Sequence, residues 1–401
     1  MSSARTTRYS RAFVATGIGF LLAWNVAVLA GLPRSASVAL GLQGFVFGVV
    51  FGKGYALIPS YFGRELAVSR APAVHLPLAV AGVIGLALGA VGGRLDLPGG
   101  STVDLVVFAD AGAILWFAGV LVFVTTIGWT VRDNLLGGET GTGEVNAHRR
   151  RVDRIANLGV PFVLGYLLAG ATVPVLEFVG LPTGPVRSGP PTTHLLAAGT
   201  ATLLVFAVGF RLLPRFLVAS VHPIFPAIAI PAGVLGPGFL VYGFPAGPTF
   251  SAGAMLLALA VLTFAVAYLD AYRRTDRNRV GLHVVAIAAV FGVATVAFGL
   301  HYAFATVLGV EAHLRLGLLG FLGLTIVGVT YQFYPPAIGP APGVGDRLAL
   351  LAALGMAVGL ALEVTGHLLG EGLLVLAGGA VVLLGSVGYA YVMFSLFLHR
   401  R

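Results

Sequence analysis

Residues 311–339 read EAHLRLGLLGFLGLTIVGVTYQFYPPAIG, and this stretch organises the rest of the chain. It is apolar over more than the roughly 20 residues that a helix needs to cross a membrane, and it begins close to a histidine. Steps that nearly complete whole helical turns would place on one face His313, Gly317, Gly320, Leu324, Gly328 and Tyr331. Two interpretations stay open. The glycines either leave room for a flat group below the histidine, or they serve close packing between helices.

The composition is that of a membrane protein. Hydrophobic residues make up 58% of the 401 residues and charged residues 10%, with a mean hydropathy of +0.96. Ordinary soluble domains carry about 25% charged residues. The chain has no cysteine, which excludes disulfides, thiolate metal sites and covalent c-type heme attachment. Nine histidines remain as the strongest candidate ligands of a metal or a heme iron.

Apolar runs long enough to cross a bilayer occur twelve times, so we expect an all-α bundle that forms a single membrane domain in lipid. The predicted spans are 12–31, 37–61, 73–93, 103–129, 155–180, 192–218, 222–243, 250–271, 281–308, 312–334, 347–368 and 373–397.

Arginine is concentrated in every second connecting segment, while the other loops hold only Arg34, Arg94 and Arg187. By the positive-inside rule this predicts an even number of spans with both termini cytoplasmic. We therefore interpret the net charge of +9 as a sign of topology and expect no nucleic acid partner. Segment 131–154, rich in glycine and then in arginine, is predicted to be a cytoplasmic linker.

A repeated pattern links three of the predicted spans. Placed in register, Tyr55, Phe210 and Tyr331 each have a proline four residues later and a glycine eleven residues earlier. These are Pro59, Pro214 and Pro335, and Gly44, Gly199 and Gly320. The pattern predicts three units of four helices, at about 1–130, 155–271 and 281–401.

Ionisable residues gather near the predicted outer ends of the spans. The histidines there are His194, His301, His313 and His367. The carboxylates there are Asp104, Asp110, Glu177, Glu311 and Glu363. Imidazole is a common ligand of metals and of heme iron, so His313, His194 and His301 are candidate ligands. The alternative is that histidines at helix ends simply lie in the headgroup region.

Twelve helices in three units, with histidines near the outer ends of the sixth and tenth, resemble subunit I of the heme–copper oxidases. In that family a His-x-His pair on the tenth helix provides one ligand to each of two hemes. The resemblance implies a heme, copper or another metal, a redox partner or second subunit, and a prokaryotic plasma membrane. The candidate cofactor-binding residues that it implies are His313, His301, His194, Arg315 and Tyr331. Of these, the three histidines are also candidate metal ligands.

The sequence departs from this pattern at the other ligands. The pair reads His313-Leu314-Arg315, and the second span has no histidine, with Ser37 and Ala39 at the aligned positions. Both ligands of the family's low-spin heme are thus missing together. Arg315 points about 200° away from His313 on an α-helix. We expect it to have an anionic partner, either a heme propionate or an outer carboxylate such as Glu311 or Glu177.

The resemblance implies binding or reduction of oxygen or nitric oxide, with an oxidoreductase activity left open because the ligands are incomplete. The rival interpretation is a multi-span transporter without heme, which would also show repeats, glycine-rich helices and carboxylates within the membrane. A transporter should have its polar groups near the bilayer midplane, whereas here they gather toward one face.

Overall fold

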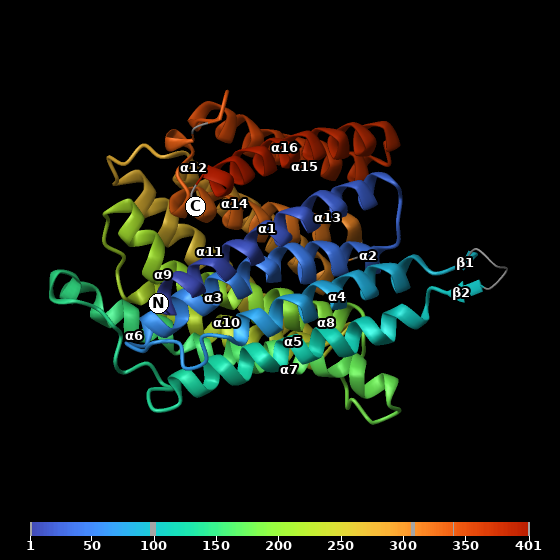
Figure 1. Cartoon of the computed structure of the whole chain (residues 1–401), viewed down its shortest axis with the longest axis horizontal. Helices are drawn as coiled ribbons and strands as arrows, with labels where there is room; N and C mark the ends of the chain where they lie inside the picture. Colours follow the sequence, from blue (N-terminus) through green and yellow to red (C-terminus); the bar gives the residue numbers. More distant parts are fainter. Residues whose placement is uncertain (1, 97–101, 306–308, 340, 400–401) are drawn as a thin grey trace. The chain divides into compact units, whose positions relative to one another are not determined.

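The computed structural model describes the whole chain except residues 1, 97–101, 306–308, 340 and 400–401. The described part contains twelve helices long and apolar enough to cross a membrane, which confirms the number of spans predicted from the sequence. The protein is a multi-pass, all-α membrane protein (Figure 1). The predicted end of the ninth span, at 306–308, lies outside the described residues.

Contacts between the helices divide the chain into two units. Unit 1 comprises Met1–Leu135 and Leu164–Leu196, and unit 2 comprises Leu136–Val163 and Ala197–Arg401.

Unit 1 contains the first four membrane helices and the second half of α7. Its elements are α1 (Ser2–Leu29), α2 (Arg34–Ser37), η1 (Val38–Val46), α3 (Phe47–Tyr61), α4 (Ala71–Val91), β1 (Arg94–Asp96), β2 (Thr102–Asp104), α5 (Val107–Val131), the end of α7 (Gly159–Phe178) and α8 (Pro190–His194). The two short strands pair antiparallel between α4 and α5.

Helices α4 and α5 pack at very short range. A Cβ atom added at Gly85 would lie 2.8 Å from the Cα of Gly112, so a side chain there would push the two backbones apart.

An aromatic cluster forms the core of unit 1. Phe51 packs against His75 with ring centroids 4.4 Å apart and against Phe123 at 4.9 Å. The imidazole Nδ1 of His75 lies 3.1 Å from the hydroxyl of Tyr55, so this buried histidine has a polar partner. His75 is therefore a core residue of unit 1.

A hydrogen bond joins the connections that follow α3 and α5 in unit 1. Arg64 Nε donates to Asp133 Oδ1 at 3.1 Å. That hydrogen bond holds the pKa of the exposed Asp133 carboxyl below its usual value. The side-chain amide of Asn134 donates to the carbonyl of Phe62 at 3.0 Å. The two connections are thus tied together at one end of unit 1.

Unit 2 contains the remaining membrane helices. Its elements are η2 (Glu144–Arg149), α6 (Arg150–Asn157), the start of α7, most of η3 (Leu195–Thr202), α9 (Leu203–Leu217), α10 (Ile224–Tyr242), α11 (Pro248–Arg273), α12 (Val280–Phe304), α13 (Val310–Arg315), η4 (Leu316–Gly323), α14 (Leu324–Phe333), η5 (Pro336–Ile338), α15 (Asp346–Leu369) and α16 (Gly372–His399). Successive helices pack as antiparallel neighbours, as α10 does with α11 and α15 with α16 (Figure 1). Helix α15 ends before Gly370, whose φ of 71° is the left-handed conformation common after a helix C-terminus.

The segment predicted to be a linker is partly helical. Residues Glu144–Arg149 form a 3-10 helix and Arg150–Asn157 an α-helix, which continues toward the fifth membrane helix. Helix α6 packs against α9, and Val152, Asp153, Ala156 and Asn157 are buried. The predicted linker 131–154 is therefore helical from Glu144 onward, because these residues have an inward face that the count of arginines did not reveal. Its cytoplasmic location remains a prediction.

Three membrane helices share an unusual feature: each begins with a short α-helical piece, continues as a π-helix and then returns to α-helix. The π segments are η1, η3 and η4. The three helices that contain them are the most buried, at 72%, 78% and 72%, against 28–56% for the other nine. A π-helix is rare and is often found at functional positions, so these three helices are the strongest candidates to carry a functional site.

Candidate functional site

An imidazole and phenol cluster lies where α12 ends and α13 begins. The ring of Tyr302 is edge-on to that of His313, with centroids 5.4 Å apart, and lies 6.4 Å from that of His301. A Cβ atom added at Gly299 would lie 3.6 Å from Cε1 of His313, so the α12 backbone runs close to this ring. The Nε2 atom of His301 is buried and has no hydrogen-bond partner among the described residues. The structure thus brings two of the predicted ligands against one tyrosine.

The third predicted ligand, His194, belongs to unit 1 and ends α8. Its Nδ1 donates to the carbonyl of Pro190 at 2.8 Å, one turn back in the same helix. In the neutral ring this hydrogen bond places the lone pair on Nε2, the nitrogen that could bind a metal. The convergence of His194 with His301 and His313 remains a prediction.

The other histidine of α12, His283, lies elsewhere in unit 2. His283 accepts from or donates to Tyr272 at 2.5 Å and lies 2.7 Å from the side-chain oxygen of Asn278. It lies 18 residues before His301, roughly 27 Å along the helix axis at 1.5 Å per residue. His283 is therefore remote from the cluster around Tyr302.

Arg315 forms a buried ion pair with Glu363 of α15. Its Nε and Nη2 atoms donate to the two carboxylate oxygens at 2.9 Å and 3.0 Å. The arginine side chain is 3% exposed and the glutamate side chain 1%. The predicted anionic partner is confirmed as a carboxylate, although it is Glu363 and not one of the two examples that the sequence suggested. Because Glu363 neutralises Arg315, the arginine does not need a heme propionate for its charge.

The glycines that follow His313 face α12 and α15 closely. A Cβ atom at Gly320 would lie 2.9 Å from side-chain atoms of Phe291 and Leu360. At Gly328 it would lie 2.6 Å from the backbone oxygen of Gly281. The positions are filled by neighbouring helices, so of the two interpretations of this row the structure shows close packing. A flat group has no room against the helix at these two glycines.

Tyr331 lies far from His313 along the tenth membrane helix. It lies in α14, 18 residues further along the chain, and its ring packs edge-on against Tyr389 at 5.6 Å. At 1.5 Å per residue this is roughly 27 Å along the helix axis. That Tyr331 and His313 bind one cofactor remains a prediction. In addition, η4 lies between them and breaks the 3.6-residue periodicity on which their common face was predicted.

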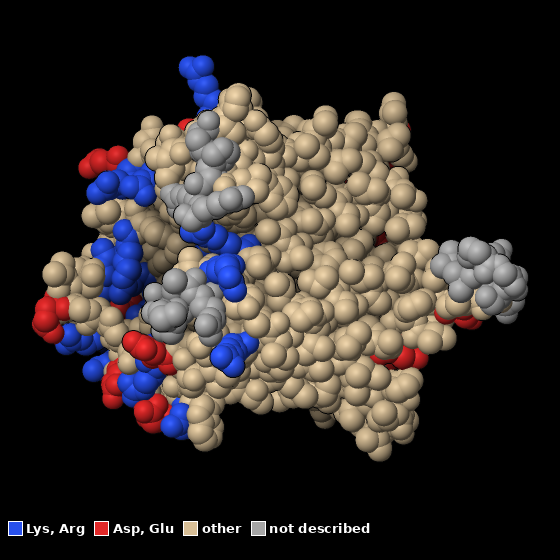
Figure 2. Space-filling model, viewed as in Figure 1, with Lys and Arg blue, Asp and Glu red and all other residues tan. Residues whose placement is uncertain are grey.

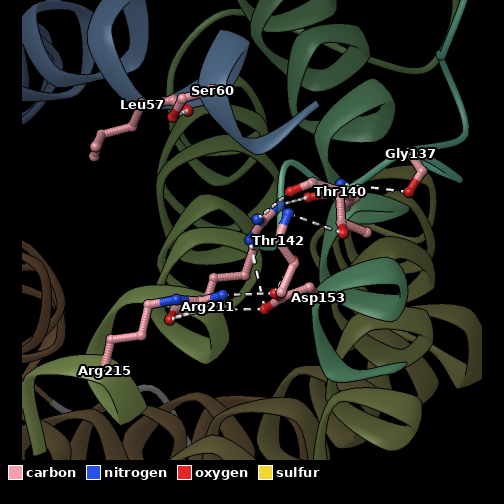
Figure 3. A network of polar contacts seen from close by, with 9 residues as sticks. Leu57, Ser60, Gly137, Thr140, Thr142, Asp153, Arg211 and Arg215 are labelled. Carbon is pink, nitrogen blue, oxygen red and sulfur yellow. Dashed lines mark hydrogen bonds and ion pairs between the residues drawn. The ribbon is translucent and has the colours of Figure 1, made fainter. Parts of the chain in front are cut away.

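A second polar cluster, which the sequence did not predict, is centred on Asp153 of α6. Figure 3 shows two arginines of α9 directed toward this carboxylate. Arg215 donates to both of its oxygens, at 3.1 Å and 2.6 Å, and Arg211 Nε lies 3.6 Å from Oδ1. Thr142 donates to Oδ2 at 2.5 Å. The Asp153 side chain is 0% exposed, so this carboxylate depends on its partners for its charge.

The same cluster fixes the segment that precedes α6. Arg211 donates to the side-chain oxygen of Asn157 at 2.6 Å and to the backbone carbonyl of Thr140 at 2.6 Å. Asn157 in turn donates to the carbonyl of Gly137 at 3.4 Å. The arginine therefore ties α9, α6 and the chain before η2 into one network (Figure 3).

One signal in the sequence could have pointed to this network. The run RRRVDR contains a single acidic residue, and Val152 and Ala156 lie on the same face of an α-helix as Asp153. All three are buried. An amphipathic pattern inside a basic run indicates a packed helix more than a solvated loop.

The donors around Tyr302 fit a heme iron or a transition metal only in part. Two imidazoles near one phenol provide suitable nitrogen ligands, and the buried Nε2 of His301 has no hydrogen bond to any residue that the structure describes. The glycine row does not fit a flat macrocycle at Gly320 and Gly328. Among the residues that the structure describes, no group of three or more His, Cys, Asp or Glu side chains could hold a metal ion.

Comparison with known proteins gives no match: no protein-family model and no curated protein sequence matches this chain.

Proposed function

We propose that this chain is a heme-binding membrane protein of the heme–copper oxidase subunit I type, with twelve spans in three units of four. The position of the π segments supports the three units. When the spans are aligned on Tyr55, Phe210 and Tyr331, the segments η1, η3 and η4 overlap, and each contains the glycine that recurs in this register. A shared local distortion at one register position is a stronger sign of repetition than matching glycines alone.

The observation that carries the proposal is the cluster of His301, Tyr302 and His313. His313 lies one helical turn before η4, and its ring contacts the same tyrosine as His301, whose Nε2 is buried without a partner among the described residues. In this proposal His313 would hold the heme iron. His301 would be a second ligand or would bind a nearby copper or other metal, and His194 is the further candidate ligand. A heme iron held here would supply a site for oxygen or nitric oxide.

The chain's own residues would position and shield that group. Tyr302 restrains both imidazole rings, and the ion pair of Arg315 with Glu363 closes the opposite side of α13. The glycine row keeps α12 against α14, so the proposed site is confined to the ends of α12 and α13 and does not extend along the helix.

The arginine distribution supports a topology with both termini and residues 131–154 in the cytoplasm of a prokaryotic cell. His301 and His313 would then lie toward the outer face of the plasma membrane. A redox partner or a second subunit would have to approach from that side, because Arg211, Arg215 and the basic connections lie at the other end of unit 2.

A transporter is the second candidate function. The ion pair of Arg315 with Glu363 and the ion pairs of Asp153 with Arg211 and Arg215 all lie in helices that are long and apolar enough to cross a membrane. Ionisable groups inside the membrane commonly mark a substrate or proton pathway. A transporter requires no heme. The two proposals therefore differ in the heme content of the purified protein, which can be measured directly.

The test is a pyridine hemochrome assay with metal analysis on the purified full-length protein. We expect a Soret band, about one heme per chain, and loss of most of the bound heme in His313→Ala. His367→Ala, at the end of α15, is the matched control and should retain it. A wild-type protein purified from heme-replete cells without heme or a transition metal would refute the proposal and favour the transporter.

A further inference from the structure

A half-open cavity of about 450 Å³ lies in unit 2, beside the network around Asp153. It is formed by η2 and α6, by the ends of α9 and α11 and by the start of α10. Its volume falls within the range of about 300–1,000 Å³ that is usual for sites of small molecules. None of the residues that line this cavity belongs to the proposed heme site.

The charged groups that line the cavity are mostly cationic. They are Arg149, Arg215 and Arg274, against the single carboxylate of Asp270. His148 and His222 also line it. Figure 2 shows blue Lys and Arg side chains gathered at the left of the view, near the place of α6 in Figure 1.

Two of the three arginines are held in place by partners that leave donors for a ligand. Arg215 is fixed by the buried Asp153, and Arg274 donates to the carbonyl of Ser220 at 2.9 Å and to Asp270 at 2.5 Å. The pair of Arg274 and Asp270 is about half exposed, at 49% and 51%, and such pairs contribute little to stability. An anion can therefore compete with Asp270 for this guanidinium.

Arg149 is the arginine with the fewest partners. Its Nη1 donates to the carbonyl of Ala219 at 3.1 Å, while its Nε is buried and has no hydrogen-bond partner among the described residues. Arg149 forms no ion pair with a described carboxylate. Arg149 is half buried beside Arg215, with Asp153 as the nearby carboxylate, and its side chain lies on the wall of the cavity. An anion in the cavity would therefore be attracted to both guanidinium groups.

The rest of the wall is apolar. Val152, Phe210, Pro214, Val221 and Phe225 line it. The cavity thus combines guanidinium forks, which match the oxygens of a phosphate group, with a surface that excludes water from an apolar group. We propose that this cavity binds an organic phosphate, with the phosphate oxygens on Arg149 and Arg274 and an apolar portion against Phe210 and Phe225.

Two sources provide this chemistry: the headgroup of an anionic phospholipid and a soluble phosphate ester. Both would place the phosphate on the same arginines, but only a lipid would remain bound through purification in detergent and exchange with lipid in micelles. The experiment therefore has two arms. Both use the full-length protein in a neutral detergent.

In the first arm, isothermal titration calorimetry measures binding of inorganic phosphate and of phenyl phosphate. We expect phenyl phosphate to bind more tightly, because its ring reaches the apolar wall. In the second arm, native mass spectrometry counts phosphatidylglycerol and phosphatidylcholine retained from mixed micelles. Retention of phosphatidylglycerol alone would identify the lipid as the source, and binding of phenyl phosphate alone would identify a soluble ester.

The variants Arg149→Gln and Arg274→Gln should each weaken binding about tenfold or more, the effect of losing a charge-assisted hydrogen bond. Arg149→Lys should recover only part of the affinity, because lysine keeps the charge but not the fork. Arg277→Gln removes the same charge from an exposed position of the neighbouring connection and should change binding less than about twofold.

Should Arg149→Gln fail to fold, Arg274→Gln still tests the site, because its side chain is half exposed. Absence of binding in both arms would overturn the proposal. So would an equal loss in Arg277→Gln, since it would show a general effect of surface charge and no defined site.

Discussion

Replacing Glu363 by glutamine tests whether this carboxylate is the counter-charge of Arg315. The substitution keeps the shape of the side chain and removes its charge. The pair is almost fully buried, at 3% and 1% exposure, and it makes two short contacts of 2.9 Å and 3.0 Å. Removal of one partner of such a pair leaves an uncompensated charge and costs about 3–5 kcal/mol. Because glutamine retains one oxygen acceptor, we expect a loss near 3 kcal/mol, at the lower end of that range.

The double variant Arg315→Met with Glu363→Met removes both charges at once. Replacement of a buried pair by apolar residues of similar volume is often neutral or stabilising. We therefore expect the double variant to be more stable than Glu363→Gln, which separates the effect of charge from that of packing. Glu371→Gln, in the exposed connection between α15 and α16, is the control for the loss of one carboxylate.

The assay is unfolding by sodium dodecyl sulfate in mixed micelles, followed by circular dichroism at far-ultraviolet wavelengths. Tryptophan fluorescence is unsuitable, because all three tryptophans, Trp24, Trp116 and Trp129, belong to unit 1. A loss below about 1 kcal/mol in Glu363→Gln, equal to that of Glu371→Gln, would refute the reasoning. It would mean that another anion neutralises Arg315, and a heme propionate would again be a candidate.

Four further results are expected. Arg315→Ala should lower stability but leave the Soret absorbance per chain unchanged, measured beside His313→Ala; equal heme loss in both would show that the faces of α13 are assigned wrongly. Gly328→Ala should cost about 1–3 kcal/mol in the same unfolding assay, because its Cβ would meet backbone of α12, whereas Gly165→Ala, with nothing within 4 Å, should not. Asp153→Asn should cost about 3–5 kcal/mol, since the buried carboxylate holds two arginines; a loss as small as that of an exposed residue would argue against the network. A cysteine at position 150 should react with an impermeant reagent only after the cells are opened, and labelling of intact cells would exclude the proposed topology.

Hydropathy predicted the twelve helices well because a bilayer leaves the chain few alternatives. A backbone in lipid must satisfy its hydrogen bonds within the span, so length and apolarity decide where helices occur. The eleventh helix was predicted at 347–368 and is Asp346–Leu369. The tenth was predicted at 312–334 and comprises Val310–Phe333.

The π segments could not be predicted in the same way. A π-helix of eight or nine residues is too short to establish a periodic pattern of its own, and its glycines are also typical of close packing. Its effect is nevertheless large, because it rotates the residues after it relative to those before it. The common face predicted for His313 and Tyr331 rested on an uninterrupted 3.6-residue period.

The network around Asp153 was missed for a different reason. Arg211 and Arg215 were counted as arginines that mark the cytoplasmic side, and that count gives an arginine the same weight whether it is buried or in water. The structure separates the two cases, because Arg211 is 3% exposed and Arg215 28%. A buried arginine near the end of a span requires an acidic partner, and that partner, Asp153, lay in the segment interpreted as a linker.

The pair of Arg315 and Glu363 also bears on what a heme could do in this protein. Reduction of oxygen by the two-heme route requires ligands for a low-spin heme, and the aligned positions hold Arg315, Ser37 and Ala39. Arg315 is directed into an ion pair with α15, so its side of α13 is closed to a second heme. Under the proposed function, a single heme on His313 would have no partner heme within the chain to deliver electrons. Under that proposal, the activity expected of these residues is binding of oxygen or nitric oxide at one heme, and sustained turnover would require a redox partner that reaches this heme directly.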